Sequence, residues 1–236
     1  MLQKYKIFFF IWFLILVVSV SKAQEDEVYY SHFRLETRIN VLAPRALSNK
    51  AFNSTFNGIY TVSGSENIHL FQGFYVGICG GNSLYQVPEY SVVSGPAVNN
   101  ATPYINTSCE MNFLGLNIGR DYYFSPKSFL STAISIGQNY TKFTDVEYVN
   151  KVPISATFNT VFIELSTGIN FGVEDHAGIG FMVDYIYLNH QFNPGDIALN
   201  QYIGYGPGSA NGNISLLEFG FVVHLEYLKR KVKMPG

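Results

Sequence analysis

Charged side chains recur at alternate positions within several otherwise apolar or glycine-rich segments of this chain. Because successive side chains of a β-strand point to opposite faces, this spacing places each charged set on one face of a strand. The candidate polar set is Arg34, Glu36, Arg38, Glu164, Asp184, Glu218, His224 and Glu226. Two kinds of chemistry remain open for it: a buried salt-bridge network, in which each charge needs an opposite partner, or a path for protons or ions.

Nucleophilic catalysis would need a histidine within hydrogen-bond reach of a serine and a carboxylate. His190 is followed by Gln191 and Phe192 rather than by a serine, and His224 lies beside Glu226 on the polar face of an apolar segment. We therefore predict that the chain is not an enzyme. No spacing of ligands indicates a metal, and no strand–helix context supports a phosphate-binding glycine loop, so no cofactor is predicted.

The N-terminal residues have the features of an export signal. Lys4 and Lys6 precede an apolar run over 7–20, and small residues follow at Ser21 and Ala23. The run is shorter than the roughly 20 residues that a membrane-spanning helix needs. The pattern predicts a cleaved signal peptide over 1–23 and one domain over 24–236, with an uncleaved anchor as the alternative.

Apolar residues in the rest of the chain are spread over alternate positions. The chain is 47% hydrophobic and only 14% charged, against about 25% charged in a typical soluble protein. Over 214–230, one face would hold Leu217, Phe219, Phe221, Val223, Leu225 and Tyr227. The same alternation predicts eight strands: 32–43, 52–62, 68–80, 109–124, 129–143, 157–173, 178–192 and 214–230.

The connections between these strands alternate between short and long, with the longest over 81–108 and 193–213. This arrangement is typical of outer-membrane barrels. A soluble barrel would instead turn its polar face to water, where glycine only weakens a strand. In this chain the polar faces are rich in glycine, which suits a crowded interior. A β-sandwich would have shorter strands. We therefore predict an all-β fold, an eight-stranded antiparallel up-and-down transmembrane β-barrel.

The last strand carries a second signature. The pattern Glu218-x-Gly220-x-x-Val223-x-Leu225-x-Tyr227 resembles the signal that the barrel-assembly machinery reads during insertion, although the chain continues to Gly236 instead of ending at an aromatic residue. The whole domain resembles the small eight-stranded outer-membrane barrels of the OmpA-transmembrane, OmpX and PorT-like types. This resemblance implies a bacterial outer-membrane location in contact with lipid, with periplasmic termini and extracellular long loops.

Two structural expectations follow from the barrel. Its first and last strands pair, so Arg34 and Arg38 should lie near Glu218 and Glu226; we favour a salt-bridge network because eight strands leave little lumen. Cys79 would end the third strand and Cys109 would start the fourth, both facing inward. An oxidising compartment would permit a disulfide between them, and two unpaired buried cysteines are the alternative.

The function predicted from these features is that of an anchor or accessory subunit in a larger outer-membrane assembly, of the secretion or barrel-assembly type. The expected partners are other outer-membrane proteins, and the net charge of −2 gives no indication of nucleic acid. A narrow channel and a lipid-modifying enzyme that uses His190 or His224 are the alternatives.

Overall fold

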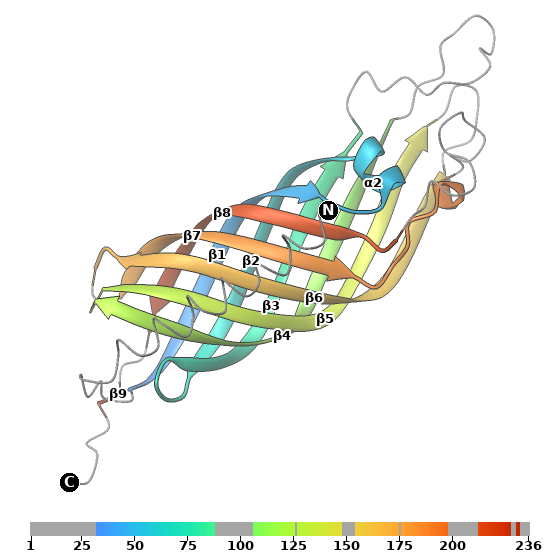
Figure 1. The fold of residues 1–236 in the computed structure, drawn as a ribbon. Coiled ribbons are helices and arrows are strands. Elements are labelled where there is room, and N and C mark those ends of the chain that lie inside the picture. Colours follow the sequence, from blue (N-terminus) through green and yellow to red (C-terminus); the bar gives the residue numbers. More distant parts are fainter. Residues whose placement is uncertain are drawn as a thin grey trace, which may run out of the picture.

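The computed structural model describes residues 32–87, 106–125, 127–147, 154–174, 176–197, 212–227 and 230–231. The predicted signal peptide over 1–23 lies outside these residues. Eight long antiparallel strands form one sheet that closes on itself, because β1 pairs with both β2 and β8 (Figure 1). They are β1 (His32–Ala46), β2 (Asn57–His69), β3 (Phe74–Gln86), β4 (Asn106–Ser125), β5 (Ser128–Glu147), β6 (Ile154–Gly172), β7 (Ala177–Leu188) and β8 (Ser215–Glu226). A two-residue strand, β9 (Arg230–Lys231), pairs with the start of β1.

The strands are staggered as a closed barrel requires. Following the paired residues around the barrel from Glu36 leads back to β1 at Ala46, ten residues further along the same strand. Such a stagger means that the strands are tilted relative to the barrel axis. Residues directly paired across the sheet therefore lie at different heights along the barrel.

Side chains alternate between the interior and the outer surface. On β7, Phe181 and Val183 are exposed, whereas Met182 and Asp184 between them are buried. The other long strands also expose aliphatic and aromatic side chains on their outer faces. This is the reverse of a water-soluble barrel, and it confirms the predicted eight-stranded antiparallel fold. Among the described residues, no helix is long and apolar enough to cross a bilayer.

The segment that follows β1 differs from the prediction. A short helix, α2 (Lys50–Thr55), occupies the beginning of the predicted second strand, and the Asn49 side chain caps it by accepting a hydrogen bond from the Phe52 N–H at 3.0 Å. The residues that the sequence placed between the second and third strands, 63–67, lie inside β2. Pairing with β1 on one side and β3 on the other outweighs the turn propensity of these residues.

The actual turn between β2 and β3 contains Gln72 and Gly73, both with positive φ. A Cβ atom on Gly73 would lie 2.2 Å from the backbone oxygen of Asp121, so only glycine fits this close approach. The shift of the turn moves β3 along the chain, and β3 continues to Gln86 instead of ending at Gly80.

The predicted disulfide between Cys79 and Cys109 is wrong because β3 is displaced along the chain. Cys79 lies opposite Gly115, whereas Cys109 lies opposite Tyr85, six positions further along β3. At about 3.3 Å per residue, these positions are about 20 Å apart, whereas disulfide-bonded Cα atoms lie within about 7 Å. Both cysteines are free.

Candidate functional site

The barrel interior is divided into three parts along its axis. Near the short turns lies a set of charged side chains, which we call the ion-pair layer: Arg34, Glu36, Arg38, His69, Asp121 and Glu226. Above it lies a cavity with three carboxylates, the acidic cavity: Glu164, Asp184 and Glu218. Beside α2 lies an apolar cluster, the aromatic plug, whose rings belong to Phe52, Phe56, Tyr85, Phe143 and Phe192.

Asp121 is the centre of the ion-pair layer and is only 1% exposed. Its carboxylate accepts hydrogen bonds from Arg34 at 2.9 Å and from Arg38 at 3.0 Å. Arg34 also donates to Glu226 at 2.7 Å, and Arg38 donates to Glu36 at 2.9 Å. Each guanidinium therefore joins two carboxylates, and the layer links β1 to β4 across the lumen and to the neighbouring strand β8.

Aromatic and hydroxyl groups hold Arg38 in place. Its guanidinium lies 4.6 Å from the centroid of the Tyr75 ring and donates to the Tyr75 hydroxyl at 3.0 Å and to Ser131. The Tyr75 ring lies against Gly119, where a Cβ atom would approach its Cζ to 2.3 Å. The small residue on β4 thus makes room for the ring that supports the arginine.

Glu36, His69 and Asp121 offer ligand atoms that all lie within 4.8 Å of one another, which is a possible metal geometry that the sequence did not predict. Arg34 and Arg38 already donate to Asp121, however, and Arg38 donates to Glu36, so that of the four carboxylate oxygens only Glu36 Oε1 has no hydrogen-bond partner among the described residues. A metal ion here would lie within a few ångströms of two positive charges and would be repelled. We therefore assign this cluster as an ion-pair network.

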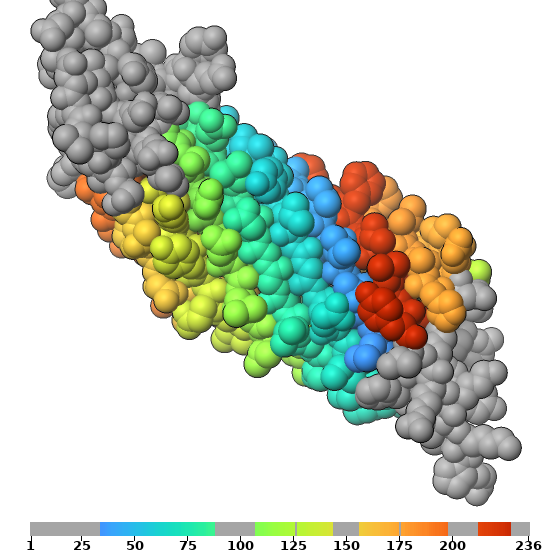
Figure 2. Space-filling model, turned by 180° about the vertical axis from the view of Figure 1, so that it is seen from behind, coloured from blue at the N-terminus to red at the C-terminus, as the bar shows by residue number. Residues whose placement is uncertain are grey.

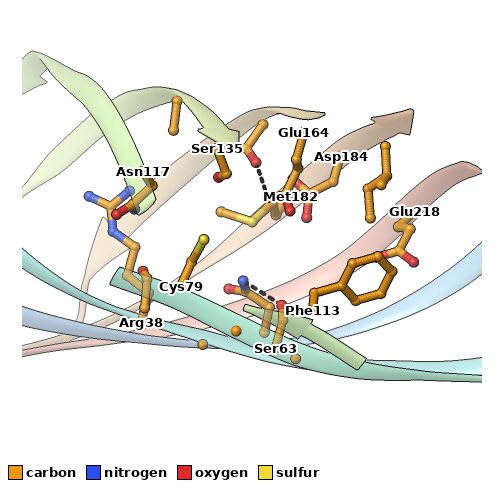
Figure 3. A pocket seen from close by; sticks show the side chains of 18 of the residues that line it. Arg38, Ser63, Cys79, Phe113, Asn117, Ser135, Glu164, Met182, Asp184 and Glu218 are labelled. Atoms are coloured by element: carbon orange, nitrogen blue, oxygen red, sulfur yellow. Dashed lines mark hydrogen bonds between the residues drawn. The ribbon is translucent and has the colours of Figure 1, made fainter. Parts of the chain in front are cut away.

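The acidic cavity has a volume of about 50 Å³ and lies between the ion-pair layer and the aromatic plug. Asp184 on β7 is paired across the sheet with Glu218 on β8, and Glu164 comes from β6 (Figure 3). Ser166 donates to Glu164 at 2.7 Å, and Thr61 donates to Glu218 at 2.7 Å. No salt bridge among the described residues reaches any of the three carboxylates.

The aromatic plug closes the interior at the other end. The Phe52 ring on α2 packs on those of Phe56, Tyr85 and Phe192, with centroids 5.0, 5.5 and 5.7 Å apart. Phe143 from β5 packs on Phe192 at 5.3 Å. All five of these rings are buried, so the described interior contains a dry apolar layer above the acidic cavity.

Comparison with solved structures identifies the architecture. Neisserial surface protein A aligns with 82% of this chain and 97% of its own, with a TM-score of 0.52 and 10% sequence identity. The chain has the fold of the small eight-stranded outer-membrane barrels. Ail of Yersinia pestis covers 83% of this chain and 99% of its own, at a TM-score of 0.45 and 10% identity. No protein-family model matches the sequence, and no curated protein matches it in sequence.

Within this outer-membrane-barrel fold, the two histidines considered for catalysis are packed against aromatic rings. The His190 ring lies 4.5 Å from that of Phe158, and its Nε2 has no hydrogen-bond partner among the described residues. Burial lowers the pKa of His190, and the nearby Asp196 carboxylate opposes this shift. His224 lies 5.3 Å from the Phe129 ring, and its Nδ1 likewise has no partner. Neither histidine forms a serine–carboxylate set in the described structure.

The sequence prediction of the polar set is correct in part. Arg34 and Glu226 form the expected ion pair between the first and last long strands, but Arg38 pairs with Glu36 and Asp121 instead of Glu218. The predicted set did not include Asp121 or His69, which the structure places in the ion-pair layer. The position of each charge along the axis was not visible in the alternating pattern.

The residues of the predicted assembly signal divide between the two faces of β8. Glu218 points inward, and Gly220 packs so closely on β1 that a Cβ atom would lie 2.2 Å from the Val41 oxygen. Val223 and Tyr227 are exposed on the outer surface, and Leu225 is half-buried. This arrangement presents alternating apolar side chains along the outer face of the last long strand.

Proposed function

We propose that this protein is a non-enzymatic integral β-barrel of the bacterial outer membrane and serves as an anchor or accessory subunit of a larger membrane protein assembly. The exposed aliphatic and aromatic residues around the barrel support the membrane location. The observation that carries the subunit role is one carboxylate, that of Glu66, within this apolar outer surface. Figure 2 shows the side of the barrel that contains β1, β2 and β3, coloured blue to blue-green.

Glu66 is exposed on β2, between the exposed side chains of Val62 and Ile68 on the same strand. On β3 it lies directly opposite Ile78, which is also exposed. The carboxylate is therefore inside the apolar belt and away from its polar borders. Ionisable groups at this depth are costly in lipid and commonly mark functional sites.

The surface beside Glu66 is suited to close contact with another protein. Thr37 donates a hydrogen bond to the carboxylate at 2.5 Å. Gly64 and Gly80, which are paired across β2 and β3, leave the adjacent wall without side chains. Small residues let membrane-embedded backbones approach closely, and polar side chains hydrogen-bond across such contacts. We call Thr37, Gly64, Glu66 and Gly80 the β2 notch.

The chemistry of the β2 notch favours a different protein over lipid or a second copy. Lipid headgroups lie at the borders of the bilayer core, away from a carboxylate that is surrounded by apolar side chains. A two-fold dimer through this surface would place Glu66 against its own symmetry mate, and like charges repel. The partner would be a membrane-spanning segment that donates a hydrogen bond or carries a lysine or arginine.

The test is a purification of a tagged copy from its native outer membrane in mild detergent. We expect a stoichiometric partner that is lost in Glu66→Leu and retained in Glu174→Gln, which removes an exposed carboxylate in the turn after β6. A photoreactive residue at Ile78 should crosslink to the same partner, whereas one at Phe181, on β7, should not. A lone monomer would refute the subunit role. A stoichiometric partner that Glu66→Leu retains would refute the β2 notch as its binding surface.

A narrow channel is the second candidate, because the acidic cavity is lined by carboxylates and has room for a few water molecules. The ion-pair layer and the aromatic plug oppose it by filling the interior on both sides of the cavity. Discrete conductance steps of the purified protein in planar bilayers would support the channel. Silent bilayers would leave the subunit role as the better account.

A further inference from the structure

Carboxylates inside the barrel are distributed unevenly relative to the positive charges. In the ion-pair layer, Arg34 and Arg38 contact Glu36, Asp121 and Glu226. In the acidic cavity, three carboxylates make no salt bridge with any described residue: Glu164, Asp184 and Glu218. Buried charges are strongly disfavoured without a counter-charge. The three carboxylates are therefore neutralised either by bound protons or by positive charge that the described part of the chain does not supply.

A second, independent feature of the cavity points to a missing ligand. Asn40 and Asn117 line the cavity, are only 9% and 8% exposed, and each has an amide oxygen with no hydrogen-bond partner among the described residues. Asp184, which is 2% exposed, has an unpartnered Oδ1 as well. Buried acceptors are normally satisfied in folded proteins, so these oxygens indicate unfilled binding capacity.

Water alone could donate hydrogen bonds to these oxygens but could not neutralise the carboxylates. A cavity of about 50 Å³ has room for roughly three to five water molecules. Water can donate to Asn40 and Asn117, and it can also accept from Arg38, which lines the same cavity. It cannot neutralise three carboxylates. Arg38 is itself directed toward Glu36 and Asp121, which hold its guanidinium in the ion-pair layer.

We propose that the acidic cavity binds a divalent cation of the Ca²⁺ or Mg²⁺ type, held by Glu164, Asp184 and cavity water, with Glu218 as an additional negative charge. Carboxylate, amide and hydroxyl oxygens are the ligands that these hard cations prefer, and both ions accept water as part of their coordination. Figure 3 shows the Glu164 and Asp184 side chains close together on one wall, with Glu218 further along it. This inference rests on the barrel interior and is independent of the proposed partner at the β2 notch.

Titration calorimetry on the full protein, refolded in detergent after removal of metals, tests the proposal directly. Ca²⁺ or Mg²⁺ should release or absorb heat in a saturable 1:1 reaction. Asp184→Asn should weaken the affinity by roughly tenfold or more, because it removes a ligand charge while keeping the side-chain shape. The exposed-carboxylate variant Glu174→Gln should bind as the wild type does.

Thermal unfolding gives a second readout that separates a metal ion from bound protons. Without divalent cations, Asp184→Asn should unfold at a higher temperature than the wild type, because it relieves repulsion between buried carboxylates. Millimolar Ca²⁺ or Mg²⁺ should raise the unfolding temperature of the wild type by more than that of Asp184→Asn. A cation bound in the acidic cavity should also slow the reaction of Cys79, which lines the cavity, with a small thiol reagent.

Three results would overturn the inference. No binding heat and no thermal shift at millimolar Ca²⁺ and Mg²⁺ would mean that protons neutralise the carboxylates. An equal loss of affinity in Glu174→Gln and Asp184→Asn would place the ion on the outer surface. Binding of Cd²⁺ but not of Ca²⁺ or Mg²⁺ would assign the cavity to a soft cation held by the sulfur atoms of Cys79 and Met182.

Discussion

Replacement of Asp121 by asparagine tests whether the ion-pair layer stabilises the barrel as a buried network. The carboxylate accepts from both Arg34 and Arg38 and is almost fully buried. Removing one partner of a buried ion pair typically costs about 3–5 kcal/mol, because the other charge is left uncompensated. Here each arginine keeps one carboxylate, Glu226 or Glu36, so we expect Asp121→Asn to cost about 3 kcal/mol, the lower end of that range.

The matched control is Glu226→Gln, at the edge of the same layer. The Arg34–Glu226 pair keeps 12% and 10% of its side-chain surface exposed, so water can replace part of the lost interaction. A hydrogen bond to a charged group contributes about 1.5–3 kcal/mol, and partial exposure reduces this, so we expect a loss of about 1–2 kcal/mol. Equilibrium urea unfolding from lipid vesicles, followed by far-ultraviolet circular dichroism, gives both free energies of unfolding.

The order of the two losses decides the outcome. If Asp121→Asn costs no more than Glu226→Gln, water reaches the centre of the layer and screens its charges. The low-dielectric, closed interior inferred from the contacts would then be wrong. A change in the dependence of the unfolding free energy on urea concentration would instead show that the variant altered the unfolded or folded ensemble. The comparison with Glu226→Gln would then be made with Asp121→Leu.

Two further predictions concern the thiols and the pH dependence. The folded protein should keep two free thiols under mild oxidation, and small reagents should modify Cys79 before Cys109, which is fully buried; mass spectrometry of a disulfide would contradict this. Because burial lowers the pKa of His190 from 6.5, the unfolded state takes up protons first as the pH falls, and stability should decrease below about pH 6.5. His190→Phe should show a smaller loss in urea unfolding between pH 6.5 and 5, and an unchanged pH profile would contradict the assignment.

Long, regular alternation made most of the barrel predictable from the sequence. The faces of β6 to β8 follow directly from the exposed and buried positions along each strand, since a strand has only two faces. The Arg34–Glu226 pair was also predictable, because a closed barrel must join its first and last long strands. The pattern identifies the face that a residue occupies, but it contains no information on the stagger between neighbouring strands.

The errors come from that missing stagger and from local turn signals. The residues at 64–67 have high turn propensity, yet they are strand residues because partners on both sides pair with them. Because the turn lies after His69 and not at 64–67, β3 includes different residues than predicted. Cys79 and Cys109 are then too far apart for the predicted disulfide. The layers of the interior were not predicted because they depend on the same stagger. The strands are offset by ten residues over one circuit of the barrel, and this offset determines which charged side chains lie at the same height.

The two unusual carboxylate sites share one part of the barrel wall. Gly64 and Gly80 belong to the β2 notch on the outside, and their backbones also line the acidic cavity on the inside. A Cβ atom at Gly80 would lie only 3.0 Å from the backbone oxygen of Phe113, which also lines the cavity. A larger residue at either glycine would therefore disturb both sites together. Separating partner binding from cation binding requires variants at Glu66 and Asp184, which point to opposite faces of the sheet.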